Sequence, residues 1–279
     1  MEVQPLAGCI GAQIAGVDLS GELSNREAAD IHAAFLAHKV LVFDGPELSP
    51  EQQLRAARVF GEPDIYPFIK GVDGYPEVIE ILKTETDKVN FGGGWHSDTT
   101  YLPEPALGTL LHAVEVPASG GDTLFANTVA AYNNALSDAM RATLDGLKGV
   151  NDSNALYGGS RAAAMAKLDG MAKNNVAEAE SYVSEHPIVR THPETGEKGL
   201  YVNRAHTRRF VDMTEDESKP LIAFLSEHIT RPEFTCRVRW QPGRVTVWDN
   251  RVTQHAALND YQGQRRLMRR VTLKGDRPV

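Results

Sequence analysis

Two short motifs near opposite ends of the chain constrain its fold more than any other feature. His96-Ser97-Asp98 places two metal-binding residue types two positions apart, and His255 follows much later. On a β-strand, side chains alternate with period two, so His96 and Asp98 would point to the same side. Two imidazoles and one carboxylate can occupy one face of an octahedral metal, an arrangement typical of non-haem Fe(II) sites. A fold that uses this set must bring the two motifs together.

Two arginines near the end of the chain point to anionic ligands. Arg266 and Arg270 share one face of a predicted strand, with Met268 between them. The alternative is that this arginine-rich run is a basic surface stripe. Apolar residues on both faces of the run favour a covered strand, where a guanidinium needs an anionic partner. Because guanidinium binds carboxylate through two parallel hydrogen bonds, an inward arginine suits the far carboxylate of a keto acid.

The available ligand types favour iron over zinc. Structural zinc prefers several thiolates, and the chain has 2 cysteines, Cys9 and Cys236, which are far apart in sequence. A catalytic zinc hydrolase remains an alternative, but it leaves the arginines unexplained and the chain has no H-E-x-x-H motif. We expect both cysteines to be reduced and buried. We expect structural roles for the remaining histidines, which are His32, His38, His112, His186, His192, His206 and His228.

Composition restricts the class of protein. Hydrophobic residues make up 42% of the chain and charged residues 24%, as in ordinary soluble proteins. The net charge of −8 argues against a nucleic-acid partner, which would need a basic face. No apolar run approaches the roughly 20 residues that span a bilayer, and the first residues lack signal-peptide features. We therefore expect a cytoplasmic protein that binds neither membranes nor nucleic acids.

Local signals predict early helices followed mainly by strands. Capping boxes at Ser24 and Ser49 predict helices that end near His38 and Phe60, with a strand over 40–43 between them. Further helices are expected over 137–147 and 214–228. Strands are expected over 78–82, 107–116, 122–126, 188–191, 199–202, 234–240, 244–248 and 267–273, with 234–240 and 244–248 forming a hairpin. Many strands with Gly/Pro turns favour a sandwich or barrel.

The segment 153–185 differs from the rest because it is rich in alanine and poor in large apolar residues. It cannot bury much area by itself, so we interpret it as a helical insertion that acts as a lid over the site. The alternative is a peripheral helical excursion. No repeat or linker divides the sequence, and we expect one domain over 1–279.

Several further motifs occur in a fixed order along the chain. They are Ile10-Gly11-Ala12-Gln13-Ile14, Gly16-Val17-Asp18-Leu19, Trp95-His96-Ser97-Asp98, Gly120-Gly121-Asp122-Thr123, Val189-Arg190-Thr191-His192-Pro193, Trp248-Asp249-Asn250-Arg251-Val252-Thr253-Gln254-His255 and Gln264-Arg265-Arg266. Together they resemble the taurine dioxygenase / dichlorophenoxyacetate dioxygenase (TauD/TfdA) family of Fe(II)- and 2-oxoglutarate-dependent dioxygenases. The resemblance covers essentially the whole chain. It implies a mainly β protein with flanking helices, a cupin-like double-stranded β-helix (jelly-roll) core, and a homodimer or homotetramer.

The resemblance also implies a reaction and a role for particular residues. His96, Asp98 and His255 would bind Fe(II), Arg266 with Thr123 would bind 2-oxoglutarate, and Arg270 would bind the substrate's anionic group. The expected reaction uses O2 to hydroxylate a small organic anion of the sulfonate, sulfate ester or aryloxyalkanoate type, yielding succinate and CO2, and some hydroxylated products would fragment. Alternatives are desaturation, epimerisation or cyclisation at the same iron site, or a non-catalytic jelly-roll binding protein.

Three positions depart from the taurine enzymes that the chain resembles. Those enzymes have His in place of Tyr66, Asn in place of Gly92 and Tyr in place of Ile69. The changes imply a more apolar substrate pocket in which Tyr66 donates one hydrogen bond or stacks on an aromatic substrate. Taurine itself is therefore not the expected substrate. Trp95 and Trp248 would either line the site or belong to the core.

Overall fold

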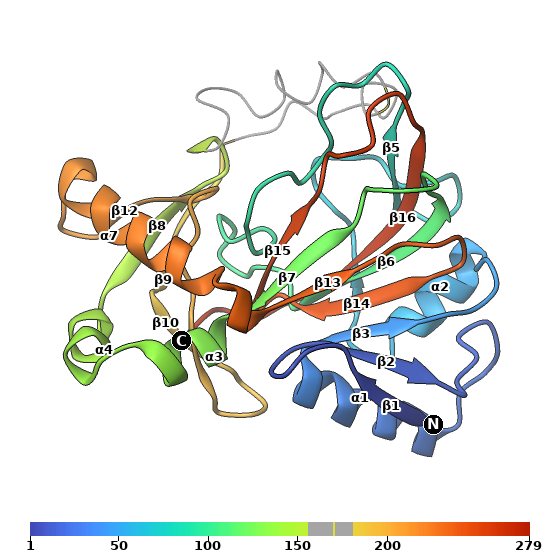
Figure 1. Cartoon of the computed structure of the whole chain (residues 1–279), viewed down its shortest axis with the longest axis horizontal. Helices are drawn as coiled ribbons and strands as arrows, with labels where there is room; N and C mark the ends of the chain where they lie inside the picture. Colours follow the sequence, from blue (N-terminus) through green and yellow to red (C-terminus); the bar gives the residue numbers. More distant parts are fainter. Residues whose placement is uncertain (156–169, 171–180) are drawn as a thin grey trace.

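The main body of the protein consists of two β-sheets that lie face to face, with helices outside them (Figure 1). The structure is a computed structural model that describes residues 1–155, 170 and 181–279. The larger sheet has the order β1-β2-β3-β14-β6-β16-β4, and β5 also pairs with β16. Its strands are β1 (Glu2–Pro5), β2 (Ala12–Ala15), β3 (Val40–Phe43), β4 (Pro63–Asp64), β5 (Val78–Lys83), β6 (Gly108–Glu115), β14 (Val245–Asp249) and β16 (Arg266–Leu273).

The smaller sheet has the order β13-β7-β15 and covers the inner face of the larger one. Its strands are β13 (Thr235–Val238), β7 (Thr123–Asn127) and β15 (Thr253–Ala257). Phe125 and Val238 from this sheet pack against Val42, Leu111 and Met268 from the larger sheet. The apolar layer between the sheets makes this body the predicted jelly roll.

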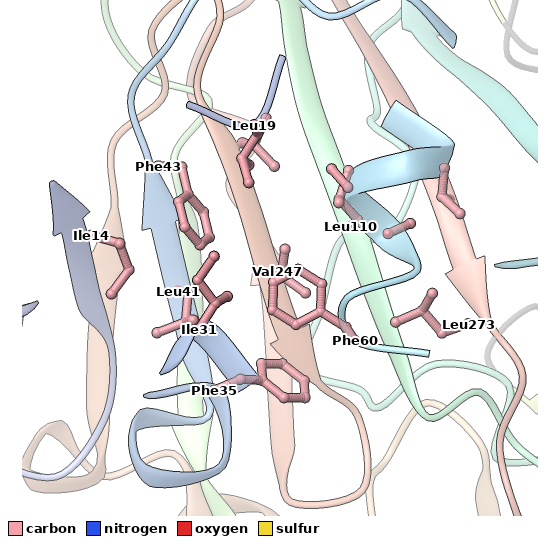
Figure 2. Close-up of a cluster of buried hydrophobic side chains, with 14 of the residues drawn as sticks. Ile14, Leu19, Ile31, Phe35, Leu41, Phe43, Phe60, Leu110, Val247 and Leu273 are labelled. Atoms are coloured by element: carbon pink, nitrogen blue, oxygen red, sulfur yellow. The ribbon is translucent and has the colours of Figure 1, made fainter. Parts of the chain in front are cut away.

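Two helices cover the outer face of the larger sheet. They are α1 (Asn25–His38) and α2 (Pro50–Ala57), and both begin with the predicted capping boxes at Ser24 and Ser49. Figure 2 shows Ile31 and Phe35 of α1 packed with Leu41, Phe43 and Val247 of the sheet. Leu273 at the end of β16 joins the same cluster. Since Met268 faces the other side, β16 is covered on both faces, as its sequence predicted.

A second group of elements lies beside the jelly roll (Figure 1). Its strands are β8 (Lys148–Asp152), β9 (Val183–Pro187), β10 (Val189–Thr191), β11 (Lys198–Leu200) and β12 (Thr207–Phe210). Its helices are α3 (Thr128–Ala135), α4 (Asp138–Leu144), α7 (Glu215–Ile229) and the 3-10 turn η2 (Pro232–Phe234). The helices predicted over 137–147 and 214–228 are confirmed as α4 and α7, and a turn over 192–197 joins β10 to β11.

The predicted hairpin between 234–240 and 244–248 is wrong. β13 pairs with β7 in the smaller sheet, whereas β14 pairs with β3 and β6 in the larger one. The Pro-Gly segment that suggested a tight turn instead carries the chain from one sheet to the other. Gly243 makes this crossing with φ of 83°, and a Cβ there would lie 2.2 Å from the carbonyl oxygen of Gly45. Only glycine fits a backbone approach this close.

Some strands were missed, and two further predictions are not tested by the structure. Several strands were not predicted, because they are short and lack a clear alternation of apolar and polar residues. These are β1, β2, β4, β8, β9, β12 and β15. The predicted lid over 153–185 lies mostly outside the described residues, and the prediction of one domain stays a prediction. Among the described residues, no helix is both long enough and apolar enough to cross a membrane.

Candidate metal centre

The two motifs that carry the predicted metal ligands lie side by side. His96 N donates to the His255 carbonyl at 3.0 Å, and His255 N donates to the His96 carbonyl at 2.8 Å. His255 belongs to β15, but the prediction that His96 and Asp98 share a strand is wrong. After His96 the chain enters a turn, in which Thr99 has φ of 51°. This turn, rather than strand alternation, directs Asp98 toward the two imidazoles.

Three potential ligand atoms converge at this point. The ligand atoms of His96, Asp98 and His255 all lie within 4.8 Å of one another. Asp98 Oδ1 is 3.8 Å from His96 Nε2 and 4.0 Å from His255 Nε2. These separations exceed hydrogen-bonding distance, yet they are short enough for one ion to contact all three atoms. The geometry therefore suits a metal held by two imidazoles and one carboxylate.

The imidazoles are held in the form that a metal requires. His96 Nδ1 lies 2.9 Å from the Gly94 carbonyl, which can only accept, so Nδ1 carries a proton and Nε2, 3.8 Å from Asp98 Oδ1, is the nitrogen that could bind a metal. Burial, followed by the nearby His96 and Arg270, lowers the pKa of His255 to about 3, although Asp98 acts in the opposite direction. His255 is therefore neutral at physiological pH. Neutral imidazole is the form that binds metal.

The second oxygen of Asp98 is fixed by the protein. Thr109 Oγ1 donates to Asp98 Oδ2 at 2.9 Å, and Arg270 Nη2 lies 3.1 Å from the same oxygen. Thr109 in turn accepts from Asn250 Nδ2 at 3.2 Å, and Asn250 Oδ1 accepts from Trp248 Nε1 at 3.0 Å. This chain of hydrogen bonds orients the carboxylate so that Oδ1 remains turned toward the imidazoles.

Electrostatics keep Asp98 ionised. Burial alone would raise the pKa of Asp98, but Arg270, His255 and His96, together with the Thr109 hydrogen bond, outweigh it and hold the pKa well below its usual range. Because imidazole binds a metal in its neutral form, one carboxylate and two imidazoles would together present a net negative charge to a cation. The donor set fits a divalent first-row metal such as Fe(II).

A cavity opens next to the three ligands and includes most of the predicted binding residues. Thr123, Gly92, Arg266 and Arg270 line it. Its apolar walls come from Ile81, Phe91, Leu111, Ala257 and Trp248. Trp95 instead packs against the apolar cluster beneath α3 and α7, so of the two tryptophans only Trp248 lines this cavity.

Arg266 and Thr123 meet at one end of the cavity through a tryptophan. The Arg266 guanidinium lies 5.7 Å from the Trp240 ring centroid, and Trp240 Nε1 donates to Thr123 Oγ1 at 3.0 Å. The Thr123 hydroxyl thus accepts from the indole and retains its own proton for a ligand. Arg266 Nε and Nη2 are buried and have no hydrogen-bond partner among the described residues. A buried guanidinium with two unpaired nitrogens fits a carboxylate ligand that enters the cavity.

Arg270 lies between the metal ligands and Tyr66. Its guanidinium carbon is 5.0 Å from the Tyr66 ring centroid, and its Nε has no partner within the described part of the chain. Tyr66 is buried in an aromatic cluster with Phe68 and Tyr101. Ile69 belongs to the same cluster, and Tyr66 and Ile69, unlike Gly92, do not line the cavity. Tyr66 therefore contacts Arg270, while Ile69 supports the wall behind it.

The sequence did not single out three residues beside this centre. Thr109 and Asn250 bind the back of Asp98, but their contacts depend on the pairing of β6 with β14 and β16, which local patterns do not encode. His206 was expected to be structural, yet its ring centroid lies 5.8 Å from that of His96 and 5.0 Å from that of Tyr101. Of these three residues, only Asn250 could have been found from the sequence, since it lies within the motif that leads to His255.

Comparison with known proteins connects this geometry to a family. The family model described as "Taurine catabolism dioxygenase TauD, TfdA family" matches residues 2–272. The chain is similar to an alpha-ketoglutarate-dependent sulfate ester dioxygenase of Pseudomonas putida, with 38% identity over 100% of this chain and 91% of the relative. It is also similar to an alkylsulfatase of Acinetobacter baylyi, with 37% identity over 99% of this chain and 86% of the relative.

Solved structures show the same likeness. A crystal structure of a taurine dioxygenase from Burkholderia xenovorans aligns with a TM-score of 0.83 and 38% sequence identity. The alignment covers 100% of this chain and 92% of that chain. The likeness in backbone and in sequence therefore extends over the whole chain.

Proposed function

This chain belongs to the TauD/TfdA family of dioxygenases, and from that premise we propose that it oxidises a small organic anion of the sulfate ester or sulfonate type. It is an Fe(II)- and 2-oxoglutarate-dependent dioxygenase, 2-oxoglutarate being the compound also called alpha-ketoglutarate. The observation that carries the proposal is that two buried arginines line the same cavity as His96 and His255, whose ligand atoms converge with that of Asp98.

Each part of the cavity has a separate task in this proposal. His96 Nε2, His255 Nε2 and Asp98 Oδ1 would hold the metal. Bound Fe(II), with O2 and 2-oxoglutarate, supplies the oxidising power that hydroxylates a carbon while the keto acid becomes succinate and CO2. The unpartnered Arg266 donors and the Thr123 hydroxyl bind the far carboxylate of 2-oxoglutarate. This places the two organic anions on different arginines.

Arg270 binds the anionic group of the substrate and so fixes which carbon faces the metal ligands. Its Nη2 is engaged by Asp98, but Nε is available and its guanidinium face rests on Tyr66. The apolar walls formed by Phe91, Leu111 and Trp248 exclude water from the reacting carbon and suit an alkyl or aryl group. An anionic head with an apolar tail matches alkyl sulfates and alkylsulfonates better than the zwitterion taurine.

Two relatives named for sulfate esters support alkyl sulfates as the first choice. Hydroxylation of the carbon that bears a sulfate ester gives an unstable product that releases sulfate. The reaction would thus leave succinate, CO2, an aldehyde and inorganic sulfate. Aryloxyalkanoates would fragment in the same way, because hydroxylation next to the ether oxygen also gives an unstable product.

The test is substrate-dependent formation of succinate by Fe(II)-loaded protein with 2-oxoglutarate and O2. The panel comprises a medium-chain alkyl sulfate, an alkylsulfonate, taurine and an aryloxyalkanoate. We expect the alkyl sulfate to give succinate and sulfate in equal amounts, well above the rate without substrate. Succinate formation at the background rate with the whole panel, despite tight binding of 2-oxoglutarate, would exclude the proposed substrate class.

A further inference from the structure

A buried lysine lies directly opposite Arg266. In the antiparallel pair of β5 and β16, Lys83 is the register partner of Arg266, so both side chains point to the same face. The Cβ atoms of such partners are about 4.5–5.5 Å apart. Lys83 is only 4% exposed and Arg266 only 6%. Like charges placed opposite each other destabilise a sheet, so the arrangement calls for an explanation.

Neither cation forms a salt bridge with the described part of the protein. Lys83 Nζ has no hydrogen-bond partner there, and Arg266 lacks partners for two of its nitrogens. Two carboxylates lie nearby but are bound elsewhere: Asp87 Oδ2 accepts from the backbone nitrogens of Thr84 and Gly170, and Asp122 Oδ2 accepts from Arg237. Two buried cations with free donors therefore form a place that an external anion would stabilise.

Tyr261 links the two cations. Lys83 Nζ lies 4.5 Å from the centroid of the Tyr261 ring, a cation–π contact. The Tyr261 hydroxyl is buried beside Arg266 and Asn90, but it makes no hydrogen bond of standard length and angle to a described residue. Lys83, Tyr261 and Arg266 thus form a layer with several unused donors.

The space behind this layer is too small to be a separate ligand site. A chamber of about 10 Å³, lined by Lys83, Tyr261 and Arg266, can hold one water molecule at most. Arg266, Ile81 and Phe91 line both this chamber and the cavity beside the metal ligands. An organic anion that neutralises Lys83 must therefore lie on the cavity side, at Arg266.

We propose that Lys83 is a second cationic positioning residue for 2-oxoglutarate, which acts from behind Arg266 on the far carboxylate. This inference rests on the proposed function. The positive charge of Lys83 adds to the attraction for a doubly charged keto acid, and the cation–π contact with Tyr261 keeps the ammonium in place. Lys83 touches neither the metal ligands nor the substrate, so it should affect binding of the co-substrate and not the chemistry.

The test measures binding of two keto acids to Fe(II)-loaded protein without O2. One is 2-oxoglutarate, and the other is 2-oxopentanoate, in which a methyl group replaces the far carboxylate. We expect Lys83→Met to weaken 2-oxoglutarate binding by about tenfold and to leave 2-oxopentanoate binding unchanged. Because the substitution removes a like-charge contact, the thermal midpoint of the ligand-free variant should equal or exceed that of the wild type. Lys83→Gln replaces Lys83→Met if the latter does not fold.

The matched control is Lys88→Met, which removes the same charge from an exposed position five residues along the chain. It should bind both keto acids as the wild type does. Unchanged 2-oxoglutarate binding by Lys83→Met, or equal loss for both keto acids, would overturn the inference and leave the proposed function intact. Failure of the wild type to bind 2-oxoglutarate would overturn both.

Discussion

Arg270 Nη2 lies 3.1 Å from Asp98 Oδ2, the oxygen that faces away from the two imidazoles. One arginine thus contacts the carboxylate ligand of the candidate metal centre and also lines the cavity that would admit the substrate. The two subsites are therefore electrostatically coupled. Binding of an anion at Arg270 will compete in part with its attraction to Asp98.

The first prediction separates the roles of two neighbouring arginines. Arg270→Met should raise the KM for the organic anion by about 10- to 100-fold, because it removes that anion's charge partner, while the Kd of 2-oxoglutarate changes little. Arg269→Met is the matched control. Arg269 points to the opposite face, where it pairs with Glu80 and Glu47, and its loss should leave both values unchanged. If Arg270→Met weakened the binding of the organic anion and of 2-oxoglutarate equally, the assignment of Arg270 to the substrate would be contradicted.

The second prediction concerns the support of the metal ligand. Thr109→Val removes the hydroxyl that holds Asp98 Oδ2 without changing the side-chain shape. Support of this kind typically contributes about 10- to 100-fold in metal affinity, so Fe(II) and Mn(II) binding should weaken by that factor. Thr109→Ser keeps the hydroxyl and should restore the affinity. Metal binding unaffected by the valine substitution would show that Arg270 alone orients the carboxylate.

The third prediction addresses substrate choice. Tyr66 packs its ring against the Arg270 guanidinium from outside the cavity lining, so it can set the position of the group that would bind the substrate's anion. Tyr66→His replaces that face with a smaller polar group that can donate to a sulfonate. Relative kcat/KM should shift from alkyl sulfates toward small sulfonates such as taurine. If wild type and variant have identical relative kcat/KM values for these substrates, Tyr66 does not take part in substrate recognition.

The fourth prediction is a pH dependence that arises away from the site. Burial, with a smaller effect of Arg269, lowers the pKa of His112 from its usual 6.5 to about 4. Its Nε2 accepts a hydrogen bond from Leu48 N, which only the unprotonated nitrogen can do. Below pH 6.5 the unfolded state binds the proton first, so the protein loses stability as the pH falls from 6.5 to 4.

The size of this loss follows from the difference between the two pKa values. It amounts to about 3 kcal/mol in the free energy of unfolding, with no further change below pH 4 from this residue. His112→Gln retains an acceptor for Leu48 but does not titrate. Denaturant unfolding at several pH values should show a flatter profile for the variant between pH 6.5 and 4. Parallel profiles would show that other groups cause the acid sensitivity.

Local sequence signals predicted the elements whose stability is local. Both capping boxes were confirmed, because the Ser24 and Ser49 caps need only residues within the next turn. The alternation around Met268 also predicted the two covered faces of β16 correctly. The hairpin prediction failed because a Pro-Gly segment shows that the chain turns but not which strand it pairs with afterwards.

The features of the candidate site also fall into two groups, those that local sequence predicts and those that depend on the fold. The ligand types and the arginine spacing could be identified from sequence, since each is a property of nearby residues. The contacts of Thr109 with Asp98 and the position of Lys83 opposite Arg266 depend on sheet register. Register is set by packing of the whole jelly roll, which no single motif records. The turn at Thr99 had no sequence signal, although it aims Asp98 at the imidazoles.

The most direct test of the central claim is the visible absorption of the protein with Fe(II) and 2-oxoglutarate in the absence of O2. A keto acid bound to Fe(II) gives a charge-transfer band that neither component shows alone. We predict this band for the wild type, and its loss in Asp98→Ala with the circular dichroism spectrum unchanged. Absence of the band in the wild type, or a band of full intensity in Asp98→Ala, would contradict the assignment of His96, Asp98 and His255 as the iron ligands.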